Sequence, residues 1–346
     1  MPTDENPESL DVRIITRPDE FNSLSEAWQE LINNCTYATP FQSPGWLIPW
    51  WKHFGNDRLW TIAVFHGQRL VGLAPLYIFD YHNHRQVTFI GTGNTDYLDI
   101  LLYKGMEQLV LDKILAYSAE HASEWDFFDL QGLLKASLLL NTPMPPGLKS
   151  AVNMQEVCPV TELPGSIDAF LSMLGSSFRK NIQRAIKMLK ASGTLTLDCA
   201  DNFNLDVYLE QLFLLHKASW QQRSINKGVL DDTVVQDFHK DAARELLGNK
   251  LLCLYALKHN GRIAATVYSL HLKKRLYFYI GGFDPELSKY SPGSVCIFMI
   301  IEKAIGDGIK EFDFLEGAEP YKYHWGAVNR NSYRLNITKT HIKDNP

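Results

Sequence analysis

A weak internal repeat constrains the fold of this chain more than any other sequence feature. The stretch 59–78, LWTIAVFHGQRLVGLAPLYI, resembles the stretch 252–270, LCLYALKHNGRIAATVYSL, at an offset of 193 residues that aligns His66 with His259. Each copy consists of an apolar run, a turn of Gly or Asn character and a second apolar run, which is the pattern of a β-hairpin. The repeat therefore predicts two similar α/β domains in tandem.

Further elements follow both copies of the hairpin. A third apolar run, expected to be a strand, lies at 86–90 after the first copy and at 276–280 after the second. Apolar residues with a 3.6-residue period predict helices that flank the strands. The predicted helices cover 19–33, 108–121, 166–191 in two segments, 205–223, 231–247 and 295–306, and a strand is expected at 311–315. The segment 140–164 holds five prolines, so we expect a loop there that leads into the second half.

Composition indicates a folded globular protein. With 346 residues, of which 45% are hydrophobic and 21% charged, the chain is long enough for about two domains. A formal net charge of -5 argues against a generally basic nucleic-acid-binding protein. The five cysteines are widely spaced and form no CxxC pair, which argues against a disulfide framework and a structural zinc site. The first residues lack the pattern of a signal peptide, and no apolar run reaches the roughly 20 residues of a membrane span, so we expect a cytoplasmic protein.

The segment 276–317 is the most informative part of the chain. It reads as an apolar strand, a loop of small residues with the sequence KYSPGS, an apolar helix, a Gly-containing turn and a second strand. Small residues at a helix start leave backbone N–H groups exposed at the positive end of the helix dipole, where a diphosphate or a carboxylate can bind. The residues expected to bind such a group are Lys289, Ser291, Gly293, Ser294 and Val295. An ordinary helix start, with Ser291 as N-cap and Pro292 as the first helical residue, explains the same pattern and stays open.

Several motifs together resemble one enzyme family. The segments GGFDPELSKYSPGSV and FDFLEGAEPYKYHWG in the last third look like the signature of the CelD-like acetyltransferases, a family of the GNAT superfamily named from cellulose and polysaccharide operons. FQSPGWLIPWWKHFG at 41–55, DYLDILL at 96–102 and SFRKNIQRAIKMLKASG in the middle fit the same family. The resemblance spans about residues 39–327. The family is similar to the Fem-type aminoacyl transferases, which carry two GNAT-like domains in tandem and so agree with the internal repeat.

The resemblance implies a donor site in the second domain alone. GNAT enzymes bind acyl-CoA, here expected to be acetyl-CoA, with the pyrophosphate on backbone amides between the fourth strand and the next helix, which corresponds to 290–295 in this chain. The loop departs from the usual Arg/Gln-x-x-Gly-x-Gly/Ala form, and Pro292 lacks an N–H donor. An acyl carrier protein or an aminoacyl-tRNA therefore stays open as an alternative carrier of the acyl group. No metal is implied.

GNAT chemistry is the direct attack of an amine or hydroxyl on a thioester, which requires a base, a proton donor for the thiolate and stabilisation of the oxyanion. Carboxylates at strand ends are the candidate bases: Glu316 after the FDFL strand, Asp284 in an Asp-Pro turn, and Asp313. A turn or strand position explains Asp284 and Asp313 equally well. By analogy of position Tyr290 is expected to protonate the departing thiolate, although a buried aromatic anchor is an equally ordinary role.

Two further sets of residues are candidates for contacts with substrates. Asp96, Tyr97, Lys322 and Trp325 are expected to bind the acceptor, with Trp325 stacking on a sugar, although packing within the fold explains them as well. The run from 179 to 190 contains five cations and no acidic residue: Arg179, Lys180, Arg184, Lys187 and Lys190. A solvated helix face explains this run, and the phosphates of a nucleotide, a tRNA acceptor stem or a lipid-linked sugar are the alternative.

These observations combine into one prediction. We expect a mixed α/β protein with two GNAT-like domains whose central sheets are flanked by helices, the N-terminal one at 1–150 and a C-terminal acyltransferase domain at 151–346. The expected reaction moves an acyl group, most simply acetyl, from acyl-CoA to an amine or hydroxyl of a sugar or another small acceptor, in polysaccharide biosynthesis. The alternatives are a Fem-like transferase that uses aminoacyl-tRNA and a GNAT-fold binding protein without catalysis. No DNA partner and no membrane span are expected.

Overall fold

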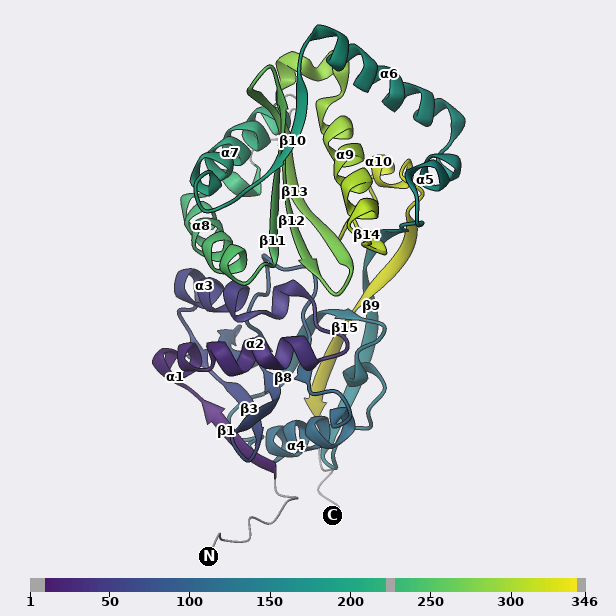
Figure 1. Cartoon of the computed structure of the whole chain (residues 1–346). Coiled ribbons are helices and arrows are strands. Elements are labelled where there is room, and N and C mark those ends of the chain that lie inside the picture. Colours follow the sequence, from purple (N-terminus) through teal and green to yellow (C-terminus); the bar gives the residue numbers. More distant parts are fainter. Residues whose placement is uncertain (1–9, 222–227, 341–346) are drawn as a thin grey trace, which may run out of the picture. The chain divides into compact units, whose positions relative to one another are not determined.

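The computed structural model describes residues 10–221 and 228–340, which fold into two compact units (Figure 1). Among these residues, unit 1 comprises 10–156 and 331–340, and unit 2 comprises 157–221 and 228–330. Both units contain sheets flanked by helices, so the predicted mixed α/β fold class is confirmed. Across the described part of the chain, no helix has the length and apolar character needed to cross a membrane.

The strands of unit 1 belong to two sheets. Their order is β1-β3-β4-β7 in one sheet and β15-β8-β6-β5-β2 in the other. The strands are β1 (Leu10–Ile15), β2 (Arg58–Leu59), β3 (Thr61–His66), β4 (Arg69–Ala74), β5 (Leu76–Tyr81), β6 (His84–Phe89), β7 (Leu101–Leu102), β8 (Phe127–Leu134) and the end of β15 (Val328–Lys339). The helices are α1 (Pro18–Ser23), α2 (Ser25–Asn34), α3 (Pro44–Phe54), α4 (Glu107–Glu120) and the 3₁₀ helices η1 (Pro40–Gln42) and η2 (Leu138–Leu140). The first predicted hairpin is confirmed as β3 and β4, which pair antiparallel across a turn where Gly67 has a φ of 60°.

Unit 2 is built on the strand order β10-β11-β12-β13-β14-β9. The strands are β10 (Leu195–Cys199), β11 (Leu252–His259), β12 (Arg262–Leu272), β13 (Arg275–Phe283), β14 (Glu311–Asp313) and the end of β9 (Leu148–Glu162). The helices are α5 (Ile167–Met173), α6 (Ser176–Ser192), α7 (Leu205–Gln221), α8 (Thr233–Gly248), α9 (Pro292–Gly306), α10 (Pro320–Tyr323) and the 3₁₀ helices η3 (Val229–Asp231) and η4 (Pro285–Tyr290). Helices α7 and α8 cover one face of the sheet and α9 covers the other (Figure 1).

The core of unit 2 explains why α9 forms. This helix is apolar almost all round, and Val295, Cys296, Ile300 and Ile301 are fully excluded from solvent, as expected for a helix packed between a sheet and another helix. Helix α6 covers the outer side of α9 and contributes Leu189 and neighbouring apolar residues to the same cluster. The position of α9 is therefore fixed by burial of apolar surface, which also fixes the place of its first residues.

The internal repeat has a physical counterpart in the two units. In each unit two strands pair in parallel, β6 with β8 and β13 with β14, and an ion pair lies where the pairing begins. Arg85 Nη2 lies 2.9 Å from Asp126 Oδ1 in unit 1, and Arg275 Nε lies 3.0 Å from Glu311 Oε1 in unit 2. Arg85 and Arg275 are 190 residues apart in the sequence, and Asp126 and Glu311 are 185 apart. The offset of 185 also relates Gly132 to Gly317, both of which have a positive φ. The repeat thus extends beyond the hairpins.

Some predicted elements differ from the structure. The segment 140–164 is mostly strand β9 and not a loop. Pro159 is tolerated in this strand because it takes part through its carbonyl, which accepts a hydrogen bond from the Phe314 amide, and not through an N–H. Helix α3 was not predicted, since Pro44 and Pro49 obscure its period. The predicted helices 19–33, 108–121 and 231–247 are confirmed within a few residues, with the first divided into α1 and α2. Part of the helix predicted at 205–223 lies outside the described residues.

Candidate functional site

Strand β14 is much shorter than its parallel neighbour β13. Their parallel pairing joins 275–277 to 311–313, while β13 continues to Phe283 with no pairing to β14 described beyond Tyr277. The residues Phe278 to Gly281 are partly exposed, which is unusual for the centre of a sheet. A central strand therefore runs on past the end of its parallel neighbour and offers one backbone edge to a ligand, at the carboxyl ends where α/β sheets commonly bind their ligands.

A β-bulge lies in β13 at this opening. The register with β12 shifts between Tyr268, which pairs with Ile280, and Ser269, which pairs with Phe278, so Tyr279 is the extra residue. Bulges alter the direction of a strand and are frequent beside active sites. The Tyr279 ring packs with Tyr268 and His239 at centroid distances of 5.9 Å and 5.5 Å. Burial, and secondarily His216, lowers the pKa of His239 to about 3, so this imidazole is neutral and serves packing. The sequence offers no signal for the bulge, because its effect appears only in the pairing register.

The start of α9 offers fewer free amides than the sequence predicts. The Ser291 amide donates to the Ser288 carbonyl at 2.9 Å, and the Val295 amide donates to the Ser291 carbonyl at 3.0 Å. Pro292 is the first helical residue, as the ordinary helix start requires, and it has no N–H. The expectation that Ser291 and Val295 bind an anion through their amides is therefore corrected. Gly293 and Ser294 lie in the first turn of the helix, where backbone amides have no carbonyl partner within the helix.

A tightly held loop follows β14. Leu315 has a φ of 58°, which is uncommon for a bulky residue, and its amide donates to Asp313 Oδ1 at 2.9 Å. The ammonium of Lys322 lies 2.6 Å from the Glu316 carbonyl oxygen and 2.9 Å from that of Gly317. Lys322 is only 3% exposed and also forms an ion pair with Glu319. These contacts fix the backbone on both sides of Glu316, whose side chain is partly exposed, so the strongest candidate base lies on a rigid loop at the opening.

The other catalytic candidates have structural partners. Asp284 is 4% exposed, its Oδ1 accepts the Glu286 amide as the cap of η4, and its Oδ2 lies 2.9 Å from Arg262 Nη2. These contacts correct its expected role as a base, since proton transfer would require a side chain that is free to reach the substrate. Asp313 is fully buried and pairs with Arg330 at 3.2 Å. Tyr290 is partly buried beneath the Lys289 ammonium, 4.8 Å from its ring centroid, at the end of η4. Its expected role as proton donor stays a prediction.

Three of the four residues expected to bind the acceptor are part of the fold. Trp325 is 1% exposed and packs edge-to-face on Phe178 at 4.8 Å, so it cannot stack on a sugar. Tyr97 is also 1% exposed, against Phe41, and Lys322 is used by the loop described above. The polar and aromatic composition of these segments suggests a binding surface, but the rings of Tyr97 and Trp325 face the protein interior. Asp96 is partly exposed and stays a candidate.

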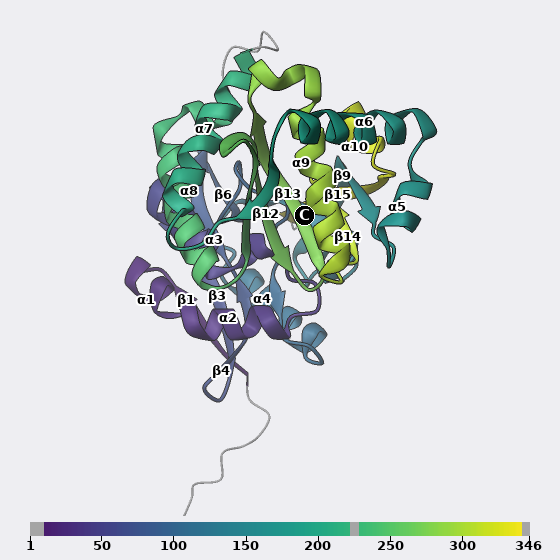
Figure 2. The same ribbon diagram turned by 45° about the horizontal axis from the view of Figure 1, so that its top comes forward.

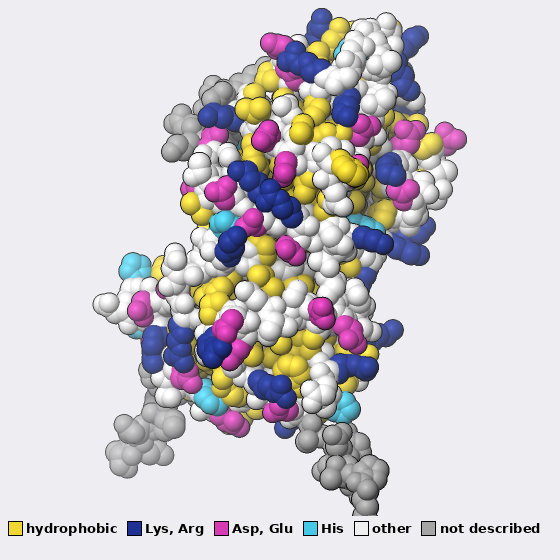
Figure 3. Space-filling view, turned by 60° about the vertical axis from the view of Figure 1, so that its left-hand side comes forward, with side chains coloured by type: hydrophobic (Ala, Val, Ile, Leu, Met, Phe, Trp, Pro, Cys, Tyr) yellow, Lys and Arg dark blue, Asp and Glu magenta, His cyan; other side chains and the backbone are white. Residues whose placement is uncertain are grey.

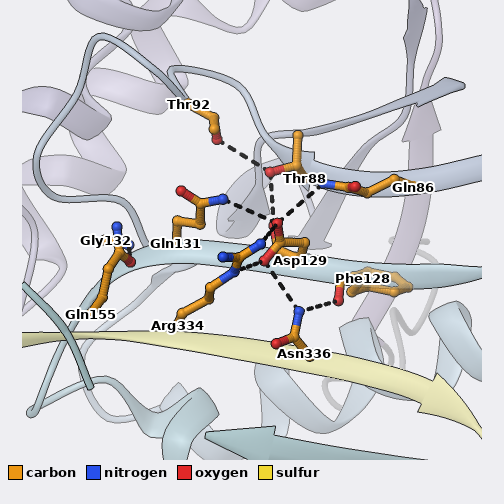
Figure 4. Close-up of polar contacts among 10 residues, drawn as sticks. All are labelled: Gln86, Thr88, Thr92, Phe128, Asp129, Gln131, Gly132, Gln155, Arg334 and Asn336. Carbon is orange, nitrogen blue, oxygen red and sulfur yellow. Dashed lines mark hydrogen bonds and ion pairs between the residues drawn. The ribbon is translucent and has the colours of Figure 1, made fainter. Parts of the chain in front are cut away.

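In unit 1 the corresponding parallel strands, β6 and β8, are joined by polar side-chain contacts (Figure 4). The Thr88 hydroxyl, immediately after the paired part of β6, donates to the Asp129 carbonyl on β8 at 2.8 Å. The buried Asp129 carboxylate accepts two bonds from Arg334, at 2.5 Å and 2.6 Å, and a 3.0 Å bond from Gln131. In unit 2 the equivalent positions of Thr88 and Asp129 are Phe278 and Phe314, whose rings lie 6.0 Å apart. The two units therefore differ at the same place: hydrogen bonds bridge the strands in unit 1, and two aromatic rings pack there in unit 2.

Asp99 in unit 1 gives the first testable prediction. Burial raises its pKa to about 7, although Ser137 Oγ and the Ile100 amide both donate to its Oδ1. The folded state thus binds a proton that the unfolded state releases near pH 4, so unfolding free energy falls as pH rises from about 4 to 7 and is constant above. Asp99→Asn, which keeps the acceptor oxygen, should raise stability at pH 8 by on the order of 2 kcal/mol and remove this slope. Urea unfolding at pH 5 and pH 8 measures both; an unchanged slope would refute the assignment.

Comparisons with known proteins identify the fold of this site. Residues 176–323, within unit 2, match the family model described as an acetyltransferase (GNAT) domain. The structure is similar to that of FemX, with a TM-score of 0.64 at 11% identity over 94% of this chain and 96% of that one. It is also similar to a conserved protein of unknown function from Bacteroides thetaiotaomicron VPI-5482, with a TM-score of 0.62 at 11% identity over 96% and 100% of the two chains.

A further similar structure is that of L-PGS from Bacillus licheniformis, with a TM-score of 0.55 at 12% identity over 95% of this chain and 94% of that one. No curated protein sequence matches the chain. The predicted GNAT acetyltransferase domain is confirmed, and the similarity to FemX agrees with the predicted relationship in fold, whereas the CelD-like family itself stays a prediction. Among the described residues there is no group of three or more His, Cys, Asp or Glu side chains that could hold a metal ion.

Proposed function

We propose that this GNAT-fold protein is an acyltransferase whose donor lies between β13 and β14, with a phosphate of the donor at the first turn of α9. The observation that carries the proposal is the end of β14 at Asp313, which leaves β13 without this partner from Phe278 to Phe283, the residue that Gly293 of the helix start lies against. A thioester arm can form hydrogen bonds to the backbone edge of β13 past the end of β14, and the partly exposed ring of Phe278 suits its apolar part. The proposal includes an N-terminal GNAT-like domain at 1–150 and the acyltransferase domain at 151–346.

The proposed reaction is the transfer of an acetyl group from acetyl-CoA to an amine or hydroxyl of a sugar or another small acceptor. The acceptor nitrogen or oxygen bonds to the thioester carbon, Glu316 takes the proton of the acceptor, and the carbon–sulfur bond breaks. The thiolate receives a proton from Tyr290, so the products are the acylated acceptor and a free thiol. Backbone amides on the open edge of β13 would stabilise the oxyanion, because fixed donors need no reorganisation during the reaction. A role in polysaccharide biosynthesis follows from the resemblance to the CelD-like family and is part of the proposal.

A variant of Gly293 tests the donor site. A Cβ at Gly293 would lie 3.5 Å from the nearest Phe283 ring carbon, an ordinary contact, so Gly293→Ala should fold normally and gain up to about 1 kcal/mol of helix stability. The added methyl group would nevertheless block close approach of a phosphate to the two amides. Millimolar acetyl-CoA should raise the melting temperature of the wild type and leave that of Gly293→Ala almost unchanged.

The matched control is Gly306→Ala at the other end of α9, where a Cβ would meet no atom within 4 Å. This variant should keep the full thermal shift of the wild type. A Gly293→Ala protein that is stabilised by acetyl-CoA as strongly as Gly306→Ala would show that the donor does not bind at this helix start.

A further inference from the structure

We propose that the cationic face of α6 docks an acidic carrier protein that presents the acyl group as a thioester on a phosphopantetheine arm. The inference rests on the proposed function, since it concerns the carrier of the same thioester donor. Helix α6 has no acidic residue in its sequence. Four of its cations are exposed: Lys180, Arg184, Lys187 and Lys190. None of them forms an ion pair with any part of the chain that the structure describes.

The arrangement of these cations is not explained by the stability of the helix. Lys180 and Arg184 are four residues apart, and Arg184 and Lys187 three apart, so like charges are direct neighbours along one face and destabilise the helix. The face of unit 2 that carries α7 and α8 is different, because acidic and basic side chains are mixed on it (Figure 3). There Arg244 pairs with Asp206 at 2.9 Å and Lys240 with Asp237 at 3.0 Å. The cations on α6 therefore lack the partners that unit 2 supplies elsewhere.

The location of α6 connects this face to the donor site. Helix α6 lies across α9 (Figure 2) and contacts both α9 and η4, the segment that leads into the two amides of Gly293 and Ser294. From Lys180 to Lys190 the helix rises about 15 Å, which matches the length of a short helix on a partner protein. An acidic protein bound along α6 would thus lie beside the point at which a prosthetic arm enters.

The amides at the helix start suit the arm of a carrier protein as well as the acetyl-CoA of the proposed function. Coenzyme A presents a diphosphate and a further phosphate, whereas a phosphopantetheine arm presents a single phosphate at its junction with the protein. The helix start supplies the amides of Gly293 and Ser294, while Ser291 and Val295 are engaged and Pro292 has no N–H. Two amides suit one phosphate, and the rest of the binding energy would come from the charges on α6.

The same features favour a protein over the two other polyanionic partners. A membrane-binding helix inserts apolar side chains between lipids, but the apolar side of α6, including Ile182 and Leu189, is buried against α9. An RNA would bring its acyl group as an ester on a ribose, without the thioester arm that the opening between β13 and β14 is proposed to hold. Binding of an RNA is retained as an outcome of the test.

The test compares two double charge reversals in the full chain. Lys187→Glu/Lys190→Glu changes the α6 face, and the matched control Lys217→Glu/Lys310→Glu changes two exposed lysines of unit 2 outside it. The probe is a fluorescently labelled bacterial acyl carrier protein in its acetylated form, with binding followed by anisotropy at low and high salt. The wild type and the control should bind it equally and lose affinity with salt, and the α6 variant should bind at least tenfold more weakly.

Acetyl-CoA distinguishes failure of the inference from failure of the proposed function. The α6 variant should keep the thermal shift produced by acetyl-CoA within twofold, because the amides of α9 are intact. If the wild type is stabilised by acetyl-CoA but does not bind the carrier protein, or if both double variants bind it equally, the inference is overturned and the proposed function stands. If an unacylated tRNA displaces the carrier protein completely at equal concentration, the face binds RNA and the inference is also overturned. If neither thioester donor binds, the proposed function fails as well.

Discussion

Glu316→Gln should reduce the turnover number for transfer from acetyl-CoA by at least about a hundredfold, the effect of losing a general base. The substitution keeps the size of the side chain, and the backbone on both sides of Glu316 is held by Lys322 and Asp313, so the fold and the donor site should not change. Release of free thiol from acetyl-CoA, with an amino sugar such as glucosamine as acceptor, measures the turnover number.

The control for this experiment is Glu302→Gln. Glu302 is exposed on α9, so its neutralisation should leave turnover at the wild-type level. Equal turnover numbers for the two variants would show that another group removes the proton. A variant that has also lost the thermal shift with acetyl-CoA would show instead that Glu316 supports donor binding.

Lys322→Met should lower the free energy of unfolding by about 3 kcal/mol, because the Lys322 side chain is 3% exposed and its ammonium donates to the carbonyls of Glu316 and Gly317. Methionine fills the same volume, so the loss reflects the missing donor for the carbonyls of Glu316 and Gly317. The melting temperature should fall by roughly 6–12 °C, and turnover should fall too, because the loop that carries Glu316 loses its anchor.

Lys303→Met is the matched change at the surface. Lys303 is half-exposed and pairs with Asp307 at 3.0 Å, an arrangement that contributes less than about 1 kcal/mol. Thermal unfolding of the two variants under the same conditions should therefore separate them by several degrees. Identical melting temperatures would mean that the loop after β14 does not depend on the buried ammonium.

The sequence predicts the elements of the donor site more successfully than the residues that act in it. Pro292 as the first residue of α9, the hairpins and the repeated strands all follow from local pattern, because turn residues and apolar periodicity act over a few positions. The bulge at Tyr279 and the end of β14 at Asp313 depend on which strands pair, and pairing is a tertiary property. The loss of free amides at Ser291 and Val295 likewise depends on backbone bonds that no pattern reveals.

The errors at the acceptor residues have a common physical cause. Lys322 and Trp325 lie in a segment of mixed polar and aromatic composition, which is as typical of a binding surface as of a loop that closes over a core. The ammonium of Lys322 is buried because backbone carbonyls surround it, and no sequence pattern describes such a cage. Strand β9 was missed for a related reason: most of its length is exposed, so its sequence lacks the alternation that marks a strand with one buried face.

The return of the chain to unit 1 has a consequence for synthesis on the ribosome. Strand β15 pairs with β8 over Ser332 to Thr338, and Arg334 supplies two of the bonds to the buried Asp129 carboxylate. A nascent chain that has emerged only to residue 330 therefore has an unneutralised carboxylate and an open strand edge in the unit that was translated first. Unit 1 can complete its folding only after residues 332–338 have left the exit tunnel, so a truncation before Ser332 would disrupt the unit that was translated first as much as the one translated later.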